Sequence, residues 1–123
     1  MLTKEELLRY NRQMLLPEFG KEGQERLKAG SVLVVGAGGL GSPALLYLAA
    51  AGVGRIGILD FDKVDVSNLQ RQILYAATDA GSYKSLTAKD KLAALNPFIQ
   101  IHTHNTFLNV SNAMDIISGY DVV

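Results

Sequence analysis

The stretch SVLVVGAGGLG, residues 31–41, decides the fold of this chain. A run rich in β-branched residues ends in the pattern Gly36-x-Gly38-x-x-Gly41, and an alanine-rich apolar segment follows directly. This order predicts a strand, a tight glycine turn and a helix, the arrangement that binds the phosphates of a nucleotide. Gly36 permits the turn, Gly38 lets the backbone approach a phosphate, and Gly41 lets the helix lie close to the strand.

Two further features favour a nucleotide site over a glycine turn that binds no ligand. The helix beginning near Leu40 points free N–H groups and the positive end of its dipole toward an anion. Asp60 ends the next apolar run, residues 56–60. Its distance from the glycines suits a carboxylate that hydrogen-bonds a ribose hydroxyl.

Composition limits the class of protein. The 123 residues suffice for one domain with its own core, and 48% hydrophobic with 20% charged residues is typical of a globular protein. Twelve basic residues balance twelve acidic ones, so neither a nucleic-acid partner nor a membrane partner is expected. The chain has no cysteine, begins with a polar segment unlike a signal peptide, and has no apolar stretch that could span a bilayer. We therefore expect a cytoplasmic protein.

The order of elements predicts an α/β fold, a Rossmann-like parallel sheet with helices on both faces. A helical segment, residues 1–30, is expected to precede the nucleotide-binding domain, residues 31–123. The expected strands are 31–35, 55–60 and 98–105, and the expected helices are 3–13, 21–28 and 40–51, one that ends near 95 after a cap at 79 or 82, and one that ends at 118 after a cap at 111 or 112. Asp121 is expected to open a fourth strand, so the domain looks incomplete and the chain looks like part of a longer protein.

Three cationic side chains and one amide are candidates for phosphate binding. Arg12 lies near the end of the first predicted helix, Arg71 lies in the long polar connection after Asp60, and Lys84 lies in the first turn of a helix. A cation in that turn opposes the helix dipole, and a bound anion would remove the conflict. Asn68 could hydrogen-bond phosphate or metal-bound water, although a turn-forming role is at least as favoured locally. On spacing alone, an ordinary surface charge is the more favoured interpretation of each cation.

Three motifs resemble those of one enzyme family. They are RYNRQ (residues 9–13), VVGAGGLGSP (34–43) and LDFDKVDVSNLQRQ (59–72). Together they closely resemble the ThiF/MoeB/HesA family of adenylyltransferases, which are related to the ubiquitin-activating enzymes. The resemblance covers essentially the whole chain, and the run from Asp60 to Gln72 is more specific than the glycine loop.

The resemblance implies a reaction. In this family the domain binds ATP with Mg²⁺, and the C-terminal carboxylate of a small ubiquitin-like sulfur-carrier protein attacks the α-phosphate. The products are an acyl-adenylate and pyrophosphate, and the pathway served is molybdopterin or thiamine synthesis. The division of labour fits phosphoryl-transfer chemistry, in which positioned cations neutralise developing charge.

The resemblance also assigns roles to residues. Asp60 would hold the ATP ribose, with Asp62 nearby in the same motif. Arg12 would reach the site of a partner subunit, which implies a homodimer. The phosphate loop would comprise Gly36, Gly38, Gly39 and Gly41, and the phosphates would contact Asn68, Arg71 and Lys84.

The sequence departs from the family pattern in two places. Residues 81–84 read GSYK, so the family's last lysine is kept while Ser82 and Tyr83 are unusual. Tyr83 is expected to serve packing more than nucleotide contact. The family's magnesium-binding Asp is expected beyond Val123, and a zinc-binding cysteine pair would lie further on. The chain by itself is therefore expected to be inactive.

Two other functions stay open. An NAD-dependent oxidoreductase also carries a glycine fingerprint, although the Asn68 and Arg71 pair has no role in hydride transfer. A non-catalytic nucleotide-binding or dimerisation module is the other alternative.

Overall fold

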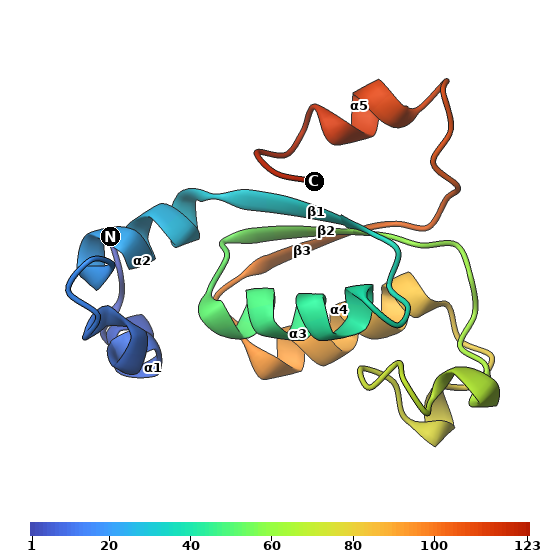
Figure 1. The fold of residues 1–123 in the computed structure, drawn as a ribbon, viewed down its shortest axis with the longest axis horizontal. Coiled ribbons are helices and arrows are strands. Elements are labelled where there is room, and N and C mark those ends of the chain that lie inside the picture. The colour runs from blue at the N-terminus through green and yellow to red at the C-terminus, as the bar shows by residue number, and fades with distance from the viewer.

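The computed structural model of this protein describes all 123 residues, and Figure 1 shows their path. Five α-helices and three strands follow one another in an order that confirms the predicted α/β class. The helices are α1 (Lys4–Met14), α2 (Gly20–Ala29), α3 (Gly41–Ala51), α4 (Lys84–Leu95) and α5 (Ala113–Ile117). The strands are β1 (Ser31–Val35), β2 (Arg55–Leu59) and β3 (Gln100–His104), and two 3-10 turns, Val66–Asn68 and Ala77–Asp79, lie between β2 and α4.

The three strands form one parallel sheet in the order β1-β2-β3. The register aligns Val34 with Ile58 and Ile58 with Thr103. All three strands therefore end at the same edge, where the loops after parallel strands place ligands in α/β folds.

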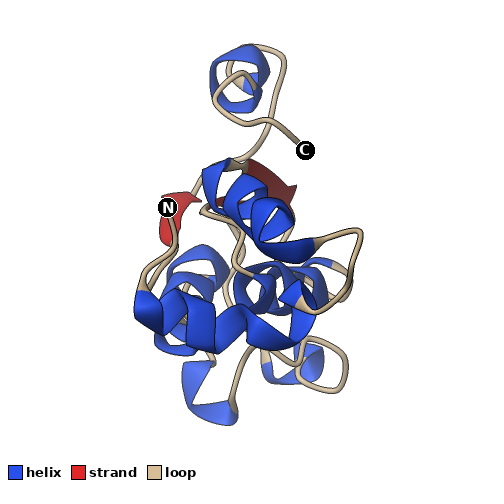
Figure 2. Ribbon diagram, turned by 90° about the vertical axis from the view of Figure 1, so that its left-hand side faces the viewer, coloured by secondary structure: helices blue, strands red, loops and turns tan.

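Helices cover both faces of the sheet, as predicted. In Figure 1, α3 and α4 lie below the sheet and α5 lies above it. The core lies on the side of α3 and α4, because Ile56 and Ile58 of the central strand pack with Leu45 and Leu92 in one buried cluster. The helical layer on the opposite face of the sheet is thinner, and Figure 2 shows its helix α5 at the top, set apart from the other helices.

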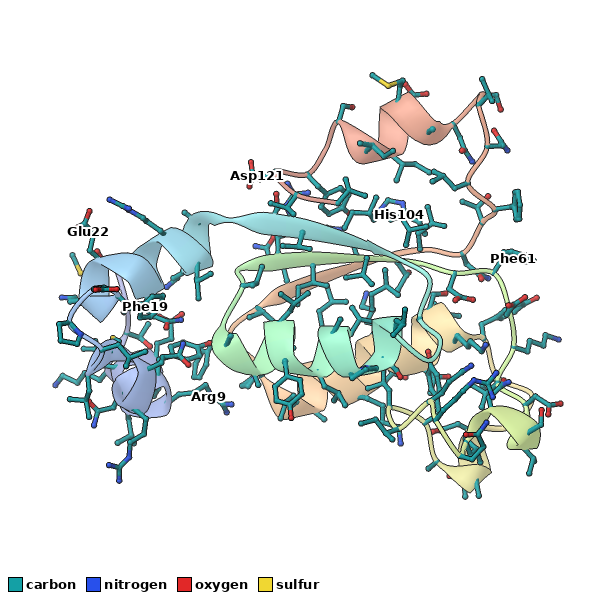
Figure 3. The ribbon with its side chains drawn as sticks, in the orientation of Figure 1. Arg9, Phe19, Glu22, Phe61, His104 and Asp121 are labelled. Carbon is teal, nitrogen blue, oxygen red and sulfur yellow. The ribbon has the colours of Figure 1, made fainter.

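The two N-terminal helices lie at the amino edge of the sheet. A capping box opens α1, in which Thr3 and Glu6 each accept the other's backbone N–H. The Asn96 side chain donates to the Tyr10 hydroxyl at 2.7 Å, so α1 lies against the carboxyl end of α4. The glycine turn follows β1 at the opposite edge, as Figure 3 indicates by the separation of Arg9 and Phe61.

Of two sequence predictions about element ends, one is met in its first residues and the other is wrong. The fourth strand expected to open at Asp121 is present as a single parallel bridge between Val32 and Val122. Tyr83 precedes α4, with no side-chain cap, where the sequence predicted a cap by Asp79 or Ser82. The Asp79 carboxylate instead accepts the Ala76 N–H at 2.7 Å within its own 3-10 turn.

The Val122 bridge still defines the topology. Val122 pairs with β1 on the side away from β2, so the chain changes direction across the sheet at β1. In open α/β sheets such a switch point is where ligands bind.

No helix in this structure has the length and apolar character needed to cross a bilayer.

Candidate nucleotide-binding site

The glycine turn after β1 requires glycine at two positions. Gly36 has φ +94°, a left-handed conformation that other residues adopt only with strain. A methyl group on Gly41 would lie 1.8 Å from the Gly36 carbonyl oxygen, so any side chain there would push α3 away from the turn. These contacts explain two of the three glycine roles that the sequence indicated.

The turn presents unused backbone donors. The N–H groups of Gly38, Gly39, Leu40 and Gly41 donate to no acceptor in the protein. By contrast, Gly36 donates to the Leu59 carbonyl at 2.8 Å, which continues the β1–β2 ladder. A helix beginning with free N–H groups and no acidic residue in its first turn, as α3 does, suits an anion.

Two adjoining cavities open at this edge of the sheet. One cavity, of about 590 Å³, lies over the glycine turn, and Arg71 forms part of its wall. The other, of about 450 Å³, lies across the ends of β1 and β2, and Val35 and Gly36 line both. The remaining lining residues of the second cavity are Leu59, Asp60, Phe61, Asp62, Phe107 and Leu108.

The second cavity is mainly apolar, with carboxylates at its edge. Phe61 and Phe107 meet edge to face with ring centroids 5.2 Å apart, and Figure 3 shows Phe61 just beyond β2. Asp60 and Asp62 supply the acidic groups. An apolar slot beside an acidic group and a row of free N–H donors has the character of a nucleoside and phosphate site.

Arg71, a candidate phosphate-binding cation in the sequence, lies against the glycine turn. A methyl group on Gly39 would lie 3.5 Å from Cδ of Arg71, so the arginine stem crosses the turn. No carboxylate pairs with its guanidinium within the chain. The structure therefore brings together Arg71 and the glycine loop, which are far apart in the sequence.

Lys84 is buried without an ion-pair partner. The residue is 6% exposed and is the first residue of α4, where its charge opposes the helix dipole. Its N–H donates to the Asp62 carbonyl at 2.9 Å, which ties the start of α4 to the segment that lines the second cavity. Its ammonium forms no ion pair and no hydrogen bond in the chain and is not itself buried, so it is available to a bound anion.

The Asn68 side chain forms a turn. Its Oδ1 accepts the Asp65 N–H at 3.0 Å, which is the local role that the sequence offered as an alternative to phosphate binding. Hydrogen bonds from Ser67 lower the pKa of Asp65 in the same turn. The amide donors of Asn68 have no partner in the chain and remain available to a ligand.

Arg12 does not reach this site within one chain. It is exposed on α1, which packs at the amino edge of the sheet, whereas the glycine turn lies at the carboxyl edge. Tyr83 lies under the Lys63 ammonium, with Nζ 5.1 Å from the ring centre, in the packing role that the sequence favoured.

Sequence reasoning missed two residues that contact the glycine turn. Gln72 is 4% exposed, its Oε1 has no hydrogen-bond partner, and a methyl group on Gly38 would lie 3.5 Å from its Nε2. The hydroxyl of buried Tyr75 donates to the Ala37 carbonyl at 2.6 Å. Gln72 belongs to the motif quoted above, but nothing local in the sequence distinguishes Tyr75 from a packing residue.

Relatives of this chain have adenylyltransferase names. A Thermus thermophilus sulfur carrier protein adenylyltransferase is 56% identical over 121 residues, which is 98% of this chain and 45% of that protein. The probable adenylyltransferase/sulfurtransferase MoeZ of Mycobacterium tuberculosis is 52% identical over 99% of this chain and 31% of its own length. The chain thus spans less than half the length of these curated relatives.

A solved structure agrees with the fold. The E. coli tRNA N6-threonylcarbamoyladenosine dehydratase TcdA, in complex with ATP, superposes with a TM-score of 0.93 at 27% identity, over 99% of this chain and 50% of that one. The model of the ThiF family matches residues 10–123. This confirms the resemblance drawn from the motifs, and the chain belongs to the ThiF family.

Proposed function

We propose that this chain is the nucleotide-binding part of an enzyme that uses ATP to adenylate the C-terminal carboxylate of a ubiquitin-like sulfur-carrier protein. The observation that carries the proposal is the row of unused N–H donors at Gly38 to Gly41 with Arg71 lying across it. Such a surface complements a chain of phosphates. The bound ATP in the structure of TcdA supports the choice of nucleotide.

The chemistry needs position and charge more than a reactive side chain. A carboxylate oxygen of the carrier attacks the α-phosphorus, the bond from that phosphorus to the α,β-bridging oxygen breaks, and pyrophosphate leaves. Negative charge accumulates on the departing oxygens, and Arg71 and Lys84 are the cations placed to stabilise it. The amide donors of Asn68 are available to orient the phosphates.

Each cavity receives one part of ATP in this proposal. The adenosine occupies the apolar slot lined by Phe61 and Phe107, and the ribose lies beside Asp60. The phosphates lie over the glycine turn. Because Val35 and Gly36 line both cavities, one nucleotide can extend from one to the other.

Magnesium is expected to accompany the phosphates. Mg²⁺ in such sites is bound by substrate phosphates, water and one or two carboxylates. Asp62 is a carboxylate at the edge of the slot, while the chain has no group of three or more His, Asp or Glu side chains that could hold a metal ion. When bound, the metal would neutralise phosphate charge beside Arg71 and Lys84.

The sulfur carrier and the dimer are the further parts of the proposal. The names of the Thermus thermophilus and Mycobacterium tuberculosis relatives support a carrier protein as the acceptor. A homodimer would let Arg12 of one subunit act at the partner's site, because α1 lies away from its own glycine turn.

Calorimetric titration of the intact protein with Mg·ATP and with NAD tests the nucleotide. We expect ATP to bind and NAD not to bind; the reverse result would favour an oxidoreductase. Carrier-dependent exchange of pyrophosphate into ATP then tests the reaction. Arg71→Ala should lower exchange by about 10²–10³-fold. Arg26→Ala, which alters an exposed arginine paired with Glu22, is the matched control and should leave exchange unchanged.

A further inference from the structure

Ala37, at the centre of the glycine turn, is held from two sides. Its N–H donates to Oδ2 of Asp60 at 2.8 Å, and its carbonyl accepts the Tyr75 hydroxyl at 2.6 Å. The alanine itself is fully buried. Both peptide groups that flank Ala37 are therefore fixed in orientation.

The peptide group between Ala37 and Gly38 carries an N–H that could donate a hydrogen bond to a phosphate. The Ala37 carbonyl and the Gly38 N–H belong to the same peptide plane, and in a trans peptide they point in opposite directions. Because the carbonyl points to buried Tyr75, the Gly38 N–H must point away from Tyr75. Gly38 lines the cavity over the turn, and its N–H has no acceptor in the protein.

The segment after Asn68 contacts the turn residue by residue. Tyr75 contacts Ala37, Gln72 lies beside Gly38, and Arg71 lies beside Gly39. The backbone keeps this spacing, because the Gln72 N–H donates to the Asn68 carbonyl and the Tyr75 N–H donates to the Gln72 carbonyl. Residues 71–75 and the glycine turn are thus packed against each other as one unit.

We propose that Tyr75 is a positioning residue of the phosphate loop: its hydroxyl holds the Ala37–Gly38 peptide so that the Gly38 N–H points at the nucleotide phosphates. The inference rests on the proposed function, since it assumes that ATP is the ligand. Tyr75 lines neither cavity, so it acts through the loop and not by touching ATP.

The hydroxyl of Tyr75 is suited to this task. Burial, aided by the negative charges of Asp60 and Asp79, raises the pKa of Tyr75 far above the physiological range. The group therefore stays protonated and always has a hydrogen to donate. Without the Tyr75 hydroxyl, the buried Ala37 carbonyl would lack a hydrogen-bond donor and the Ala37–Gly38 peptide could rotate.

Tyr75→Phe tests the inference because it removes the hydroxyl and keeps the ring. Titration of the intact protein with ATP and with adenosine separates the phosphate loop from the nucleoside slot. We expect affinity for ATP to fall about tenfold, because the competent loop orientation becomes a minor state, and affinity for adenosine to stay unchanged.

Tyr10→Phe is the matched control. Tyr10 is another buried tyrosine with a bonded hydroxyl, at the far edge of the sheet, where it accepts from Asn96. Both variants lose one buried hydrogen bond, so a comparable fall in melting temperature is expected. With Tyr10→Phe neither the ATP nor the adenosine affinity should change.

Several outcomes would overturn the inference. Wild-type ATP affinity in Tyr75→Phe would do so, and so would an equal loss for ATP and adenosine. A second measurement needs no variant: hydrogen exchange at the Gly38 amide should slow when ATP binds and not when adenosine binds, and no slowing with ATP would refute the orientation. If the wild-type protein bound no ATP, the proposed function would fail and this inference with it.

Discussion

The Asp60 carboxylate accepts the Ala37 N–H at 2.8 Å, so the end of β2 is bonded directly to the glycine turn. Its other oxygen accepts the Asp62 N–H, also at 2.8 Å. Asp60 therefore shapes the site before any ligand arrives, in addition to the ribose contact that its position in the motif predicts. Because each carboxylate oxygen has two lone pairs, both functions are compatible.

Asp60→Asn should destabilise the protein. An amide of the same size has one accepting oxygen, so its NH₂ group would face one of the two N–H donors. Leaving one of these donors without an acceptor should lower the free energy of unfolding by about 1 kcal/mol or more, measured by urea denaturation. Asp90→Asn, at an exposed position of α4, is the control, and equal midpoints for the two variants would contradict the structural role.

Lys84→Met should separate activity from stability. The lysine forms no ion pair in the chain and its charge opposes the dipole of α4, so an apolar side chain of similar length should give an unfolding free energy at least equal to that of the wild type. Pyrophosphate exchange should fall by about 10²-fold or more, because transition-state charge loses a cation. A variant that lost stability and activity in parallel would indicate a structural lysine.

Much of the fold could be predicted from local sequence. Strand β1 and the glycine turn carry their own signals, and the alternation of strands and helices indicated a parallel sheet. The ends of elements were less predictable, since the cap of α4 depends on how the loop before it folds. Asp79 is a good cap by residue type, yet its own 3-10 turn uses its carboxylate.

The site was predictable only in part, for a similar reason. Glycine spacing, the acidic residue after β2 and the isolated cations are sequence patterns with known chemistry. The contacts of Tyr75 and Gln72 with the turn depend on the three-dimensional path of residues 61–78, and no periodicity encodes that path. In the sequence, Tyr75 is one residue of a long polar connection and carries no mark of a contact with the glycine turn.

Acid should weaken the attachment of α1 to α2. Burial alone would raise the pKa of Glu6, but hydrogen bonds from Lys28 and Thr3 outweigh it and hold the pKa below its ordinary value of 4.5. A carboxyl with a lowered pKa stabilises the fold above the pKa of the unfolded state, and this contribution is lost as pH falls through the lower folded-state value.

Glu6→Gln tests this pH dependence. The free energy of unfolding of the wild type should fall steeply below pH 4.5, and the variant should show a shallower fall because it has one carboxyl fewer to protonate. Urea denaturation from pH 7 to about pH 3 measures both curves. Glu5→Gln changes an exposed neighbour and should keep the wild-type slope; parallel curves for wild type and Glu6→Gln would refute the assignment.

Mixing two inactive variants should reveal whether Arg12 acts across a dimer. Arg12→Ala and Arg71→Ala each lack one component of the site. If Arg12 reaches the partner's site, a mixed dimer has one site with Arg71 from its own subunit and Arg12 from the other. Random reassembly makes half of the dimers mixed, each with one complete site, so pyrophosphate exchange should recover to about a quarter of the wild-type rate.

The same mixture distinguishes the alternatives. If Arg12 acted within its own subunit, the mixed dimer would have one site without Arg12 and one without Arg71, and no activity would return. If the protein were monomeric, mixing would again restore nothing, and sedimentation would show a single-chain mass. Because α1 lies at the opposite edge of the sheet from the glycine turn, recovery is the expected result.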